Sequence, residues 1–261
     1  MLEEWAKEEI LPHTGNIKST ERLGNALCNR VYFLDAANGR YIVKIADGEK
    51  RRRELKNEAA VLAFLRGQID VPEVFLHRES EKISCLLMEY IDGEVFQSLL
   101  ENNGPDITGR LSDLGRTLQK IHSVKLPWDY QYREVMDRHL AQAEMNRQNG
   151  LLDPDEFVAD GMMTEPGELL RSLVTQGLEM EETRVCLLHG DFRPKNILVN
   201  NGCVVVDWGF CAVGDPYYDL AMILYYLNRQ ERAVFLEGYG IKDLDCARLT
   251  YFGSLSKYIN V

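Results

Sequence analysis

The sequence lacks the features of secreted and membrane-spanning proteins. Its longest apolar runs, such as residues 221–227, are far shorter than the roughly 20 residues that cross a bilayer. Its N-terminal residues are acidic and contain neither the cationic start nor the apolar stretch of a signal peptide. The six cysteines form no Cys-x-x-Cys pair, which indicates buried thiols in a reducing cytosol, not disulfides or a zinc site. We therefore expect a cytoplasmic protein without a membrane partner.

Basic residues are also scarce. Lys and Arg number 30 against 41 Asp and Glu, so the formal net charge is -11. Nucleic-acid binding needs clustered cations that contact phosphates, so this balance argues against a nucleic-acid partner. An acidic excess fits a cationic substrate, or solubility alone. With 261 residues, 45% of them hydrophobic, the chain suffices for one large domain or two lobes.

The first ninety residues have mostly strand character, interrupted by one helix. The turn-forming residues 35–39 lie between two β-branched and aromatic runs and predict a hairpin. Residues 51–67 have leucines and alanines at helical spacing and end at a glycine. We therefore expect an N-terminal lobe over residues 1–91 and a second lobe over residues 92–261. The predicted strands are 30–34, 41–45, 71–76 and 83–90.

The second lobe has mainly helical character. Residues 111–122 place four aliphatic side chains on one face, which is typical of an amphipathic helix. Residues 123–186 are long and polar and are expected to form a helical insert. Two short strands, 197–199 and 203–206, surround an Asn-Asn-Gly turn and predict another hairpin.

Polar residues flank this second hairpin on both sides. Asp191 and Asn196 lie in a proline-containing loop before the first strand, and Asp207 ends the second strand. Because a hairpin brings the residues before one strand close to those after the other, the three side chains are expected to meet. Two carboxylates and an amide oxygen suit Mg²⁺, with one carboxylate left to act as a base.

The same spacing matches the phosphoryl-transfer site of kinases. There the loop aspartate and the metal-binding asparagine are separated by four residues, as Asp191 and Asn196 are here. Asp207, Trp208 and Gly209 stand where protein kinases have Asp-Phe-Gly. Either motif alone is compatible with a buried capping aspartate and a polar turn, but both in this order favour a kinase site.

The N-terminal half supplies a cation and its partner. Lys44 lies in an apolar predicted strand, where a buried ammonium needs an anion. Glu58 lies on the apolar side of the following helix, one turn before Leu62, and we favour it over Glu54 as that partner. Such a pair would hold the lysine against nucleotide phosphates. Residues 24–32 contain one glycine where the phosphate-covering loop of protein kinases has three, so this segment alone is weak evidence for a nucleotide site.

Taken together, these motifs resemble the aminoglycoside phosphotransferase family of small-molecule kinases. The resemblance implies an α+β, bilobal, protein-kinase-like fold: an antiparallel five-stranded N-lobe with one helix, and a mainly helical C-lobe. It also implies a hinge at residues 89–92 and an acceptor-binding helical insert over about residues 123–186. The matching segments are 43–45, 58–65, 86–93, 118–123, 189–198 and 206–221.

The family resemblance assigns a role to each of these residues. Asp191 would be the catalytic base or would orient the substrate hydroxyl. Asn196 and Asp207 would hold Mg²⁺ on the phosphates of ATP, and the sequence does not distinguish ATP from GTP. Lys44, fixed by Glu58, would contact the α- and β-phosphates.

The resemblance also covers residues outside the phosphate site. Main-chain groups of Glu89 and Ile91 would face the adenine edge, so their side chains matter little. Asp219 would brace the catalytic loop or cap the following helix, and His189 would have a structural role. Arg193 replaces a histidine found in many members, and its guanidinium is a candidate to stabilise the transferring phosphoryl group.

The favoured function is ATP-dependent phosphorylation of a small-molecule hydroxyl, with a cationic, aminoglycoside-like antibiotic as one candidate acceptor. The C-terminus lacks the acidic residues with which family members that modify a 3'-hydroxyl often touch the drug. Kinases of choline or another amino alcohol, of homoserine or of a sugar remain alternatives, and Trp128, Tyr130 and Tyr132 are candidates for a choline cage. A protein kinase is less favoured, because Gly190 replaces the usual arginine. A nucleotide-binding pseudokinase would require the loss of site residues that are all present.

The acceptor prediction depends on an acidic segment. Residues 150–182 contain nine acidic side chains and one arginine, a net charge of -8. An acid-rich solvated surface is the alternative explanation, because exposed charges more than a Debye length away are screened. Pro154 and Phe157 suggest an ordered helix start, so we expect Asp155, Glu156 and Asp160 to contact a cationic acceptor.

Overall fold

The computed structural model describes residues 3–23, 30–102, 104, 106–159 and 162–259, and it forms two compact units. The first unit comprises Met1–Phe96 with Asn196–Cys211, and the second comprises Gln97–Lys195 with Ala212–Val261. Packing therefore groups residues 196–211 with the N-terminal part of the chain. The lobe boundary between residues 91 and 92 stays a prediction.

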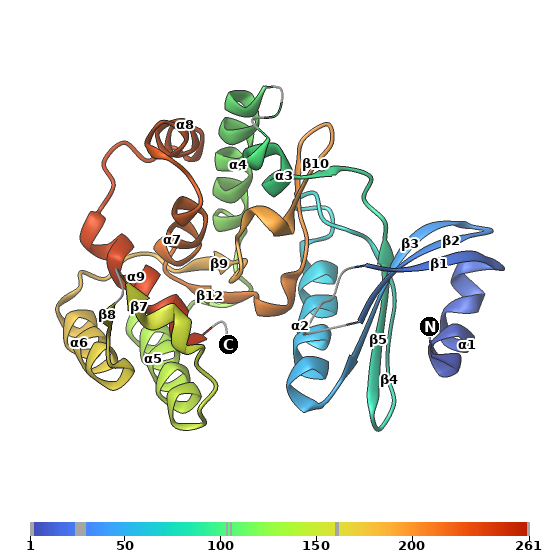
Figure 1. Ribbon diagram of the computed structural model, residues 1–261, viewed down its shortest axis with the longest axis horizontal. Coiled ribbons are helices and arrows are strands. Elements are labelled where there is room, and N and C mark those ends of the chain that lie inside the picture. Colours follow the sequence, from blue (N-terminus) through green and yellow to red (C-terminus); the bar gives the residue numbers. More distant parts are fainter. Residues whose placement is uncertain (1–2, 24–29, 103, 105, 160–161, 260–261) are drawn as a thin grey trace. The chain divides into compact units, whose positions relative to one another are not determined.

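The first unit contains a five-stranded antiparallel sheet in the order β1-β2-β3-β5-β4 (Figure 1). The predicted first hairpin is confirmed, because β2 and β3 pair up to the tight turn at residues 37–38. The predicted α+β fold class is likewise confirmed. The strands are β1 (Ile17–Leu23), β2 (Arg30–Ala36), β3 (Gly39–Asp47), β4 (Val74–Glu79) and β5 (Ile83–Glu89).

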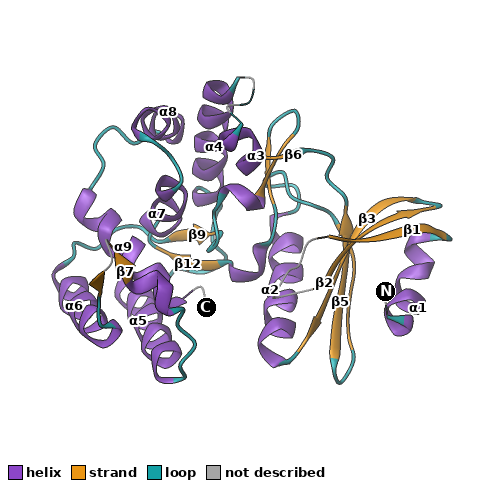
Figure 2. Ribbon diagram, in the orientation of Figure 1, coloured by secondary structure: helices purple, strands orange, loops and turns teal. Residues whose placement is uncertain are grey.

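A helix covers each face of this sheet (Figure 2). Helix α1 (Glu4–Thr14) packs Ala6 and Ile10 with Val43 and Ile45 of β3 in one apolar cluster. Because side chains alternate along a strand, the intervening Lys44 faces the other helix, α2 (Glu49–Leu65). Helix α1 was not predicted, since its two fully buried apolar residues lie among charged ones and give little helical pattern.

The predicted second hairpin also belongs to the first unit. Strands β10 (Ile197–Val199) and β11 (Cys203–Val205) pair antiparallel, and β6 (Glu94–Val95) pairs with the free side of β10. Two 3₁₀ helices flank the hairpin, η2 (Pro194–Asn196) before it and η3 (Trp208–Phe210) after it. Pairing with β6 thus ties the hairpin, which has Asn196 before it and Asp207 after it, to residues 94–95 of the same unit.

The second unit is mainly helical, as predicted. Its core is an apolar cluster to which α5, α6, α7 and α9 contribute. Strands β9 (Cys186–Leu188) and β12 (Ala212–Gly214) pair antiparallel, and a short hairpin joins β7 (Val158–Ala159) to β8 (Met162–Met163). The helices are α3 (Phe96–Glu101), α4 (Ile107–His122), α5 (Tyr132–Gln148), α6 (Pro166–Glu179), α7 (Tyr217–Tyr225), α8 (Arg229–Tyr239) and α9 (Cys246–Ile259).

The cysteine thiols and the apolar character of the helices can also be compared with what the sequence predicted. Cys85, Cys186 and Cys203 are buried free thiols, but Cys246 is exposed at the start of α9, so the prediction of burial is wrong for that residue. No helix within the described residues combines the length and apolar character needed to span a bilayer.

Candidate active site

Lys44 and Glu58 form a buried ion pair between β3 and α2. The Lys44 Nζ lies 2.7 Å and 2.9 Å from the two carboxylate oxygens of Glu58. The side chains are 9% and 1% exposed, so each charge needs the other to offset its loss of hydration. Glu54, the competing partner in the sequence, instead lies 4.0 Å from Lys50.

Asp207 is the second carboxylate on the same lysine. Its Oδ1 lies 2.7 Å from the Lys44 Nζ, and its side chain is 45% exposed. The residue has a φ of 68°, a left-handed conformation that is uncommon outside glycine and that clusters at functional sites. The following backbone N–H, of Trp208, donates to Glu58 Oε1 at 3.3 Å, so one glutamate orients both the lysine and the Asp207 turn.

Further contacts hold this turn in place. The Trp208 side chain is fully buried, and its indole N–H donates to the Val205 carbonyl at 2.9 Å. The Asn57 amide donates to the carbonyls of Gly209 and Cys211, each at 3.0 Å. Helix α2 therefore supports the turn that presents Asp207.

The electrostatics of the pair keep the lysine charged. Burial by itself would lower the pKa of Lys44, but the carboxylates of Asp207 and Glu58 outweigh burial and raise that pKa above its ordinary value. The lysine is therefore an ammonium at all physiological pH values, and it offers a fixed cation to an anionic ligand.

A cavity of about 420 Å³ lies beside this cluster within the first unit. Lys44, Asp207 and Asn196 lie at its polar part, and Glu89 and Ile91 are also in its wall. The Glu89 N–H donates to the Glu73 carbonyl at 2.8 Å, so a contact from Glu89 to a ligand edge would use its carbonyl oxygen. The apolar lining residues are Leu23, Val31, Ile42, Pro72, Met88, Val95, Leu198 and Val206.

Asn196 and Asp207 have the donor chemistry for Mg²⁺. Both line the cavity, and both offer the oxygen ligands that this ion prefers. Among the described residues there is no group of three or more His, Cys, Asp or Glu side chains that could hold a metal ion alone. A carboxylate and an amide oxygen fit the common Mg²⁺ site, in which phosphate oxygens and waters complete the shell.

Asp191 lies in the second unit, on the loop that follows β9. It is 2% exposed and forms an ion pair with Arg193, whose side chain is 29% exposed. The Lys195 Nζ lies 3.8 Å from the other carboxylate oxygen. The chain passes into the first unit immediately after Lys195, at Asn196.

Asp219, in the first turn of α7, braces this loop. Its carboxylate accepts hydrogen bonds from the backbone N–H of His189 at 2.7 Å and of Gly190 at 2.9 Å. The His122 Nε2 lies 3.1 Å from the same carboxylate. His189 is fully buried, and its Nδ1 accepts from the Asp191 N–H at 3.2 Å, which gives it the structural geometry that the sequence predicted.

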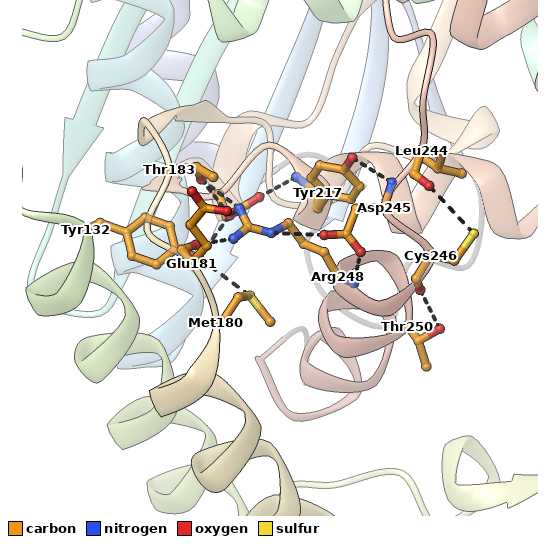
Figure 3. A network of polar contacts seen from close by, with 11 residues as sticks. Tyr132, Met180, Glu181, Thr183, Tyr217, Leu244, Asp245, Cys246, Arg248 and Thr250 are labelled. Carbon is orange, nitrogen blue, oxygen red and sulfur yellow. Dashed lines mark hydrogen bonds and ion pairs between the residues drawn. The ribbon is translucent and has the colours of Figure 1, made fainter.

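A buried arginine network fixes the start of α7 (Figure 3). Arg248 of α9 donates to Asp215 at 2.7 Å and to Thr183 at 2.8 Å, and it also contacts the Glu181 carbonyl. The Asp215 Oδ1 accepts from the N–H of Tyr217, the first residue of α7, at 2.9 Å. Arg248 was not predicted from the sequence, because no local pattern relates it to Asp215, which lies 33 positions earlier.

Tyr132 also belongs to this network. Its hydroxyl donates to Asp215 at 2.9 Å, and its ring is buried. Trp128, by contrast, is 71% exposed, and Tyr130 packs against the core of the unit with Arg138 over its ring. Because its ring is buried, Tyr132 is not accessible to form the choline-binding cage that the sequence suggested.

A second cavity, of about 430 Å³, lies beside Arg193 within the second unit. The predicted ordered start is present as the 3₁₀ helix η1 (Pro154–Phe157), capped by the Asp153 side chain. Glu156 lines the cavity together with Asp153, whereas Asp155 is exposed and is not in the cavity wall. Asp160 lies outside the described residues. Sequence analysis missed Asp153, whose capping role is typical of an aspartate before a proline.

Comparisons with known proteins agree with this architecture. An aminoglycoside 3'-phosphotransferase of Enterococcus faecalis is 26% identical over 249 residues, which is 90% of each chain. The crystal structure of an aminoglycoside-3'-phosphotransferase of type VIII superposes with a TM-score of 0.76 at 19% identity, covering 98% of this chain and 100% of that one. APH(3'')-Id of Streptomyces rimosus, solved with ADP and streptomycin, gives 0.75 at 21% identity, covering 99% of both chains. At such identities the structures show a shared fold.

The family assignment comes from the sequence as a whole. The model of the phosphotransferase enzyme family, APH, matches residues 19–252, which is most of the chain. This match includes both hairpins, the Lys44–Glu58 pair and the loop that carries Asp191. The chain belongs to the APH phosphotransferase enzyme family.

Proposed function

We propose that this phosphotransferase transfers the terminal phosphoryl group of ATP, bound with Mg²⁺, to a hydroxyl group of a small molecule. The observation that carries the proposal is the Lys44 ammonium held by Glu58 and Asp207 at the wall of a cavity of about 420 Å³. An apolar cavity with a fixed cation at one part suits a flat base attached to phosphates. GTP, which has the same phosphates, is the alternative donor.

The residues of the first unit act on the nucleotide. Lys44 contacts the α- and β-phosphates, and Glu58 keeps its ammonium in place. Asn196 and Asp207 hold Mg²⁺, which neutralises charge on the phosphates when it is bound. The Glu89 carbonyl and the Ile91 N–H contact the adenine edge.

The residues of the second unit act on the acceptor. The Asp191 carboxylate accepts a hydrogen bond from the acceptor hydroxyl and orients its oxygen toward the γ-phosphorus. It takes the hydroxyl proton as the new P–O bond forms, while the bond from the γ-phosphorus to the bridging oxygen breaks and ADP leaves with that oxygen. The Arg193 guanidinium, next to this carboxylate, stabilises negative charge on the transferring phosphoryl group. Asp219 keeps the loop in the conformation that this geometry requires.

An amine-bearing acceptor is the favoured class. The sequence relatives are aminoglycoside 3'-phosphotransferases, and their acceptors carry amino groups, as their name implies. Asp155, Glu156 and Asp160 are the acidic residues that we expect to attract such a cation, and Glu156 lines the second cavity. A kinase of a small metabolite such as choline, homoserine or a sugar is the second candidate. Of these, homoserine, which has a carboxylate, suits the Arg193 and Lys257 side chains that also line this cavity.

The test measures nucleotide binding and turnover separately. We expect Asp191→Ala to abolish acceptor-dependent ADP release while the Kd for Mg-ATP stays within a few-fold of wild type. Asp207→Ala should instead weaken nucleotide binding in the presence of Mg²⁺, with little effect when Mg²⁺ is chelated. Binding is measured by calorimetry, and turnover by a coupled ADP assay against aminoglycosides, amino alcohols, sugars and macrolides.

The two variants control for each other, since each removes one carboxylate from a different unit. Near-normal turnover in Asp191→Ala would overturn the assignment of the catalytic loop. Unchanged Mg²⁺-dependent binding in Asp207→Ala would overturn the metal assignment.

A further inference from the structure

The cavity beside Arg193 contains charges of both signs. Its wall includes the acids Asp153 and Glu156 and the bases Arg193 and Lys257. The remaining lining is apolar, aromatic or small: Leu151, Ala221, Met222, Tyr225, Tyr226, Gly253 and Ser256. Eight of the nine acids in residues 150–182 are described by the structure, and two of these eight lie in this wall, so the net charge of -8 on that segment overstates the negative charge that the described wall presents to an acceptor.

Lys257 is the fixed cation of this cavity. Its Nζ donates to the Glu156 carbonyl at 2.7 Å and lies 5.9 Å from the centre of the Phe157 ring. Within the described part of the chain, no carboxylate lies within 4 Å of this ammonium. A carbonyl fixes the position of a charge without neutralising it, so the ammonium is available to an anion.

The other charged groups differ in how far they are already neutralised. Arg193 forms its ion pair with Asp191, which balances that guanidinium. Asp153 accepts the Asp155 N–H as the cap of η1, and Glu156 is exposed at the same helix. No Lys or Arg side chain that the structure describes lies within 4 Å of either acid. The cavity thus offers two carboxylates and one ammonium to a ligand.

We propose that the acceptor of this enzyme carries an acidic group as well as an amino group, and that Lys257 is the specificity residue that selects the acidic group. The inference rests on the proposed function and names the class of its acceptor. Asp153 and Glu156 bind the amino group, and Lys257 binds a carboxylate or a phosphate. A polycation without an acidic group would place its positive charges next to the Lys257 ammonium, and this repulsion disfavours binding of the polycation.

Matched acceptor pairs test the acidic group directly. Muramic acid is glucosamine with a lactyl ether that adds a carboxylate, and homoserine has a carboxylate where 2-aminobutane-1,4-diol has a hydroxymethyl group. Each pair keeps an amino group and at least one hydroxyl, and kanamycin serves as the polycation. We expect the carboxylated member of at least one pair to have a kcat/KM about tenfold or more above its partner, in the range of a charged hydrogen bond.

Variants of Lys257 assign the preference to this residue. Lys257→Met should remove the tenfold ratio, Lys257→Arg should retain it, and Lys257→Glu should lower the KM for kanamycin. The KM for ATP should be unchanged in all three, which also reports that they fold. Lys242→Glu makes the same change in net charge as Lys257→Glu, but at an exposed residue outside the cavity wall, and it should leave every ratio as in wild type.

Three results would overturn the inference. The first is a kcat/KM that, in both pairs, is equal or higher for the member without a carboxylate. The second is a ratio that survives Lys257→Met. The third is that no carboxylated compound raises ADP release above the acceptor-free rate. Asp191→Ala, measured in the same assay, distinguishes a wrong acceptor class from a wrong proposed function. If turnover of a cation-only acceptor requires Asp191, the proposed function stands and only the acceptor class is wrong; turnover independent of Asp191 refutes both.

Discussion

Removing Lys44 should destabilise the protein, because it strands the carboxylate of Glu58. Glu58 is 1% exposed, and Lys44 supplies hydrogen bonds of 2.7 Å and 2.9 Å to its two oxygens. In Lys44→Met the one hydrogen bond that this carboxylate keeps from the described residues is that of the Trp208 N–H, at 3.3 Å. Asp207 also loses the lysine, but it is half-exposed and water can hydrate it.

The size of the effect follows from the burial of the pair. Breaking a buried ion pair by removing one partner typically costs about 3–5 kcal/mol. The remaining Trp208 hydrogen bond places our expectation for Lys44→Met near the lower end, at about 3 kcal/mol. The double variant Lys44→Met with Glu58→Gln should recover most of this loss, since it replaces the stranded charge by a neutral group of the same shape.

The loss should depend on pH in a defined direction. Burial raises the pKa of Glu58, and the Lys44 ammonium opposes that rise. Without Lys44, the folded state therefore binds the Glu58 proton more tightly than the unfolded chain does. The destabilisation is then small below the unfolded pKa of about 4.3 and grows as pH rises through the raised folded pKa. The double variant should show no such growth.

Tryptophan fluorescence during urea unfolding is the assay. Trp208 is fully buried in the first unit and Trp128 is 71% exposed in the second, so the signal reports mainly on the unit that contains the pair. Unfolding midpoints are compared for wild type, single and double variants at pH 5 and pH 8. A Lys44→Met midpoint equal to wild type at pH 8, or a double variant no more stable than the single one, would refute the reasoning.

Three more predictions follow from single residues. Asp219→Ala should lower kcat at least about tenfold with an unchanged Kd for ATP, because the catalytic loop loses the acceptor of two backbone N–H groups; steady-state kinetics and calorimetry check this. Gly115→Ala places a Cβ 2.2 Å from a carbonyl oxygen of α8 and should lower the thermal midpoint, whereas Gly202→Ala, which meets nothing within 4 Å, should not. Burial lowers the pKa of His139 to about 4, so the wild type should lose stability as pH falls from 6.5 toward 4, and His139→Phe should lose less over that range in urea unfolding.

The arrangement of the proposed nucleotide site was predictable because each part of it follows from local sequence. Alternation along a strand gives the direction of Lys44, helical spacing gives the direction of Glu58, and a tight hairpin brings Asn196 and Asp207 into one unit. These are short-range rules, and each acts within a few residues. Glu54 shares this helix face one turn earlier, and Glu58 was favoured over it because Leu62 and Leu65 follow Glu58 at helical spacing.

The acceptor side was harder to predict, since it depends on long-range packing. The proline at position 154 located an ordered start, but it did not show that Asp153 and Glu156, and not Asp155, would line the cavity. Lys257 reaches that wall from a helix about a hundred residues later in the chain, and Arg248 reaches Asp215 in the same way. No periodicity or spacing in the sequence relates such pairs.

Arg193 explains why overall acidity is a poor guide to the acceptor. Its guanidinium pairs with the buried Asp191, so the carboxylate that we propose as catalytic adds little net charge to the cavity before an acceptor binds. A neutral side chain at this position would leave that carboxylate as an additional attraction for cations. With Arg193 present, the charge that distinguishes acceptors comes from Asp153, Glu156 and Lys257 alone among the described lining residues. At the proposed acceptor site we therefore expect the positive charge of Lys257, more than the net charge of -8 on residues 150–182, to decide which amines the enzyme accepts.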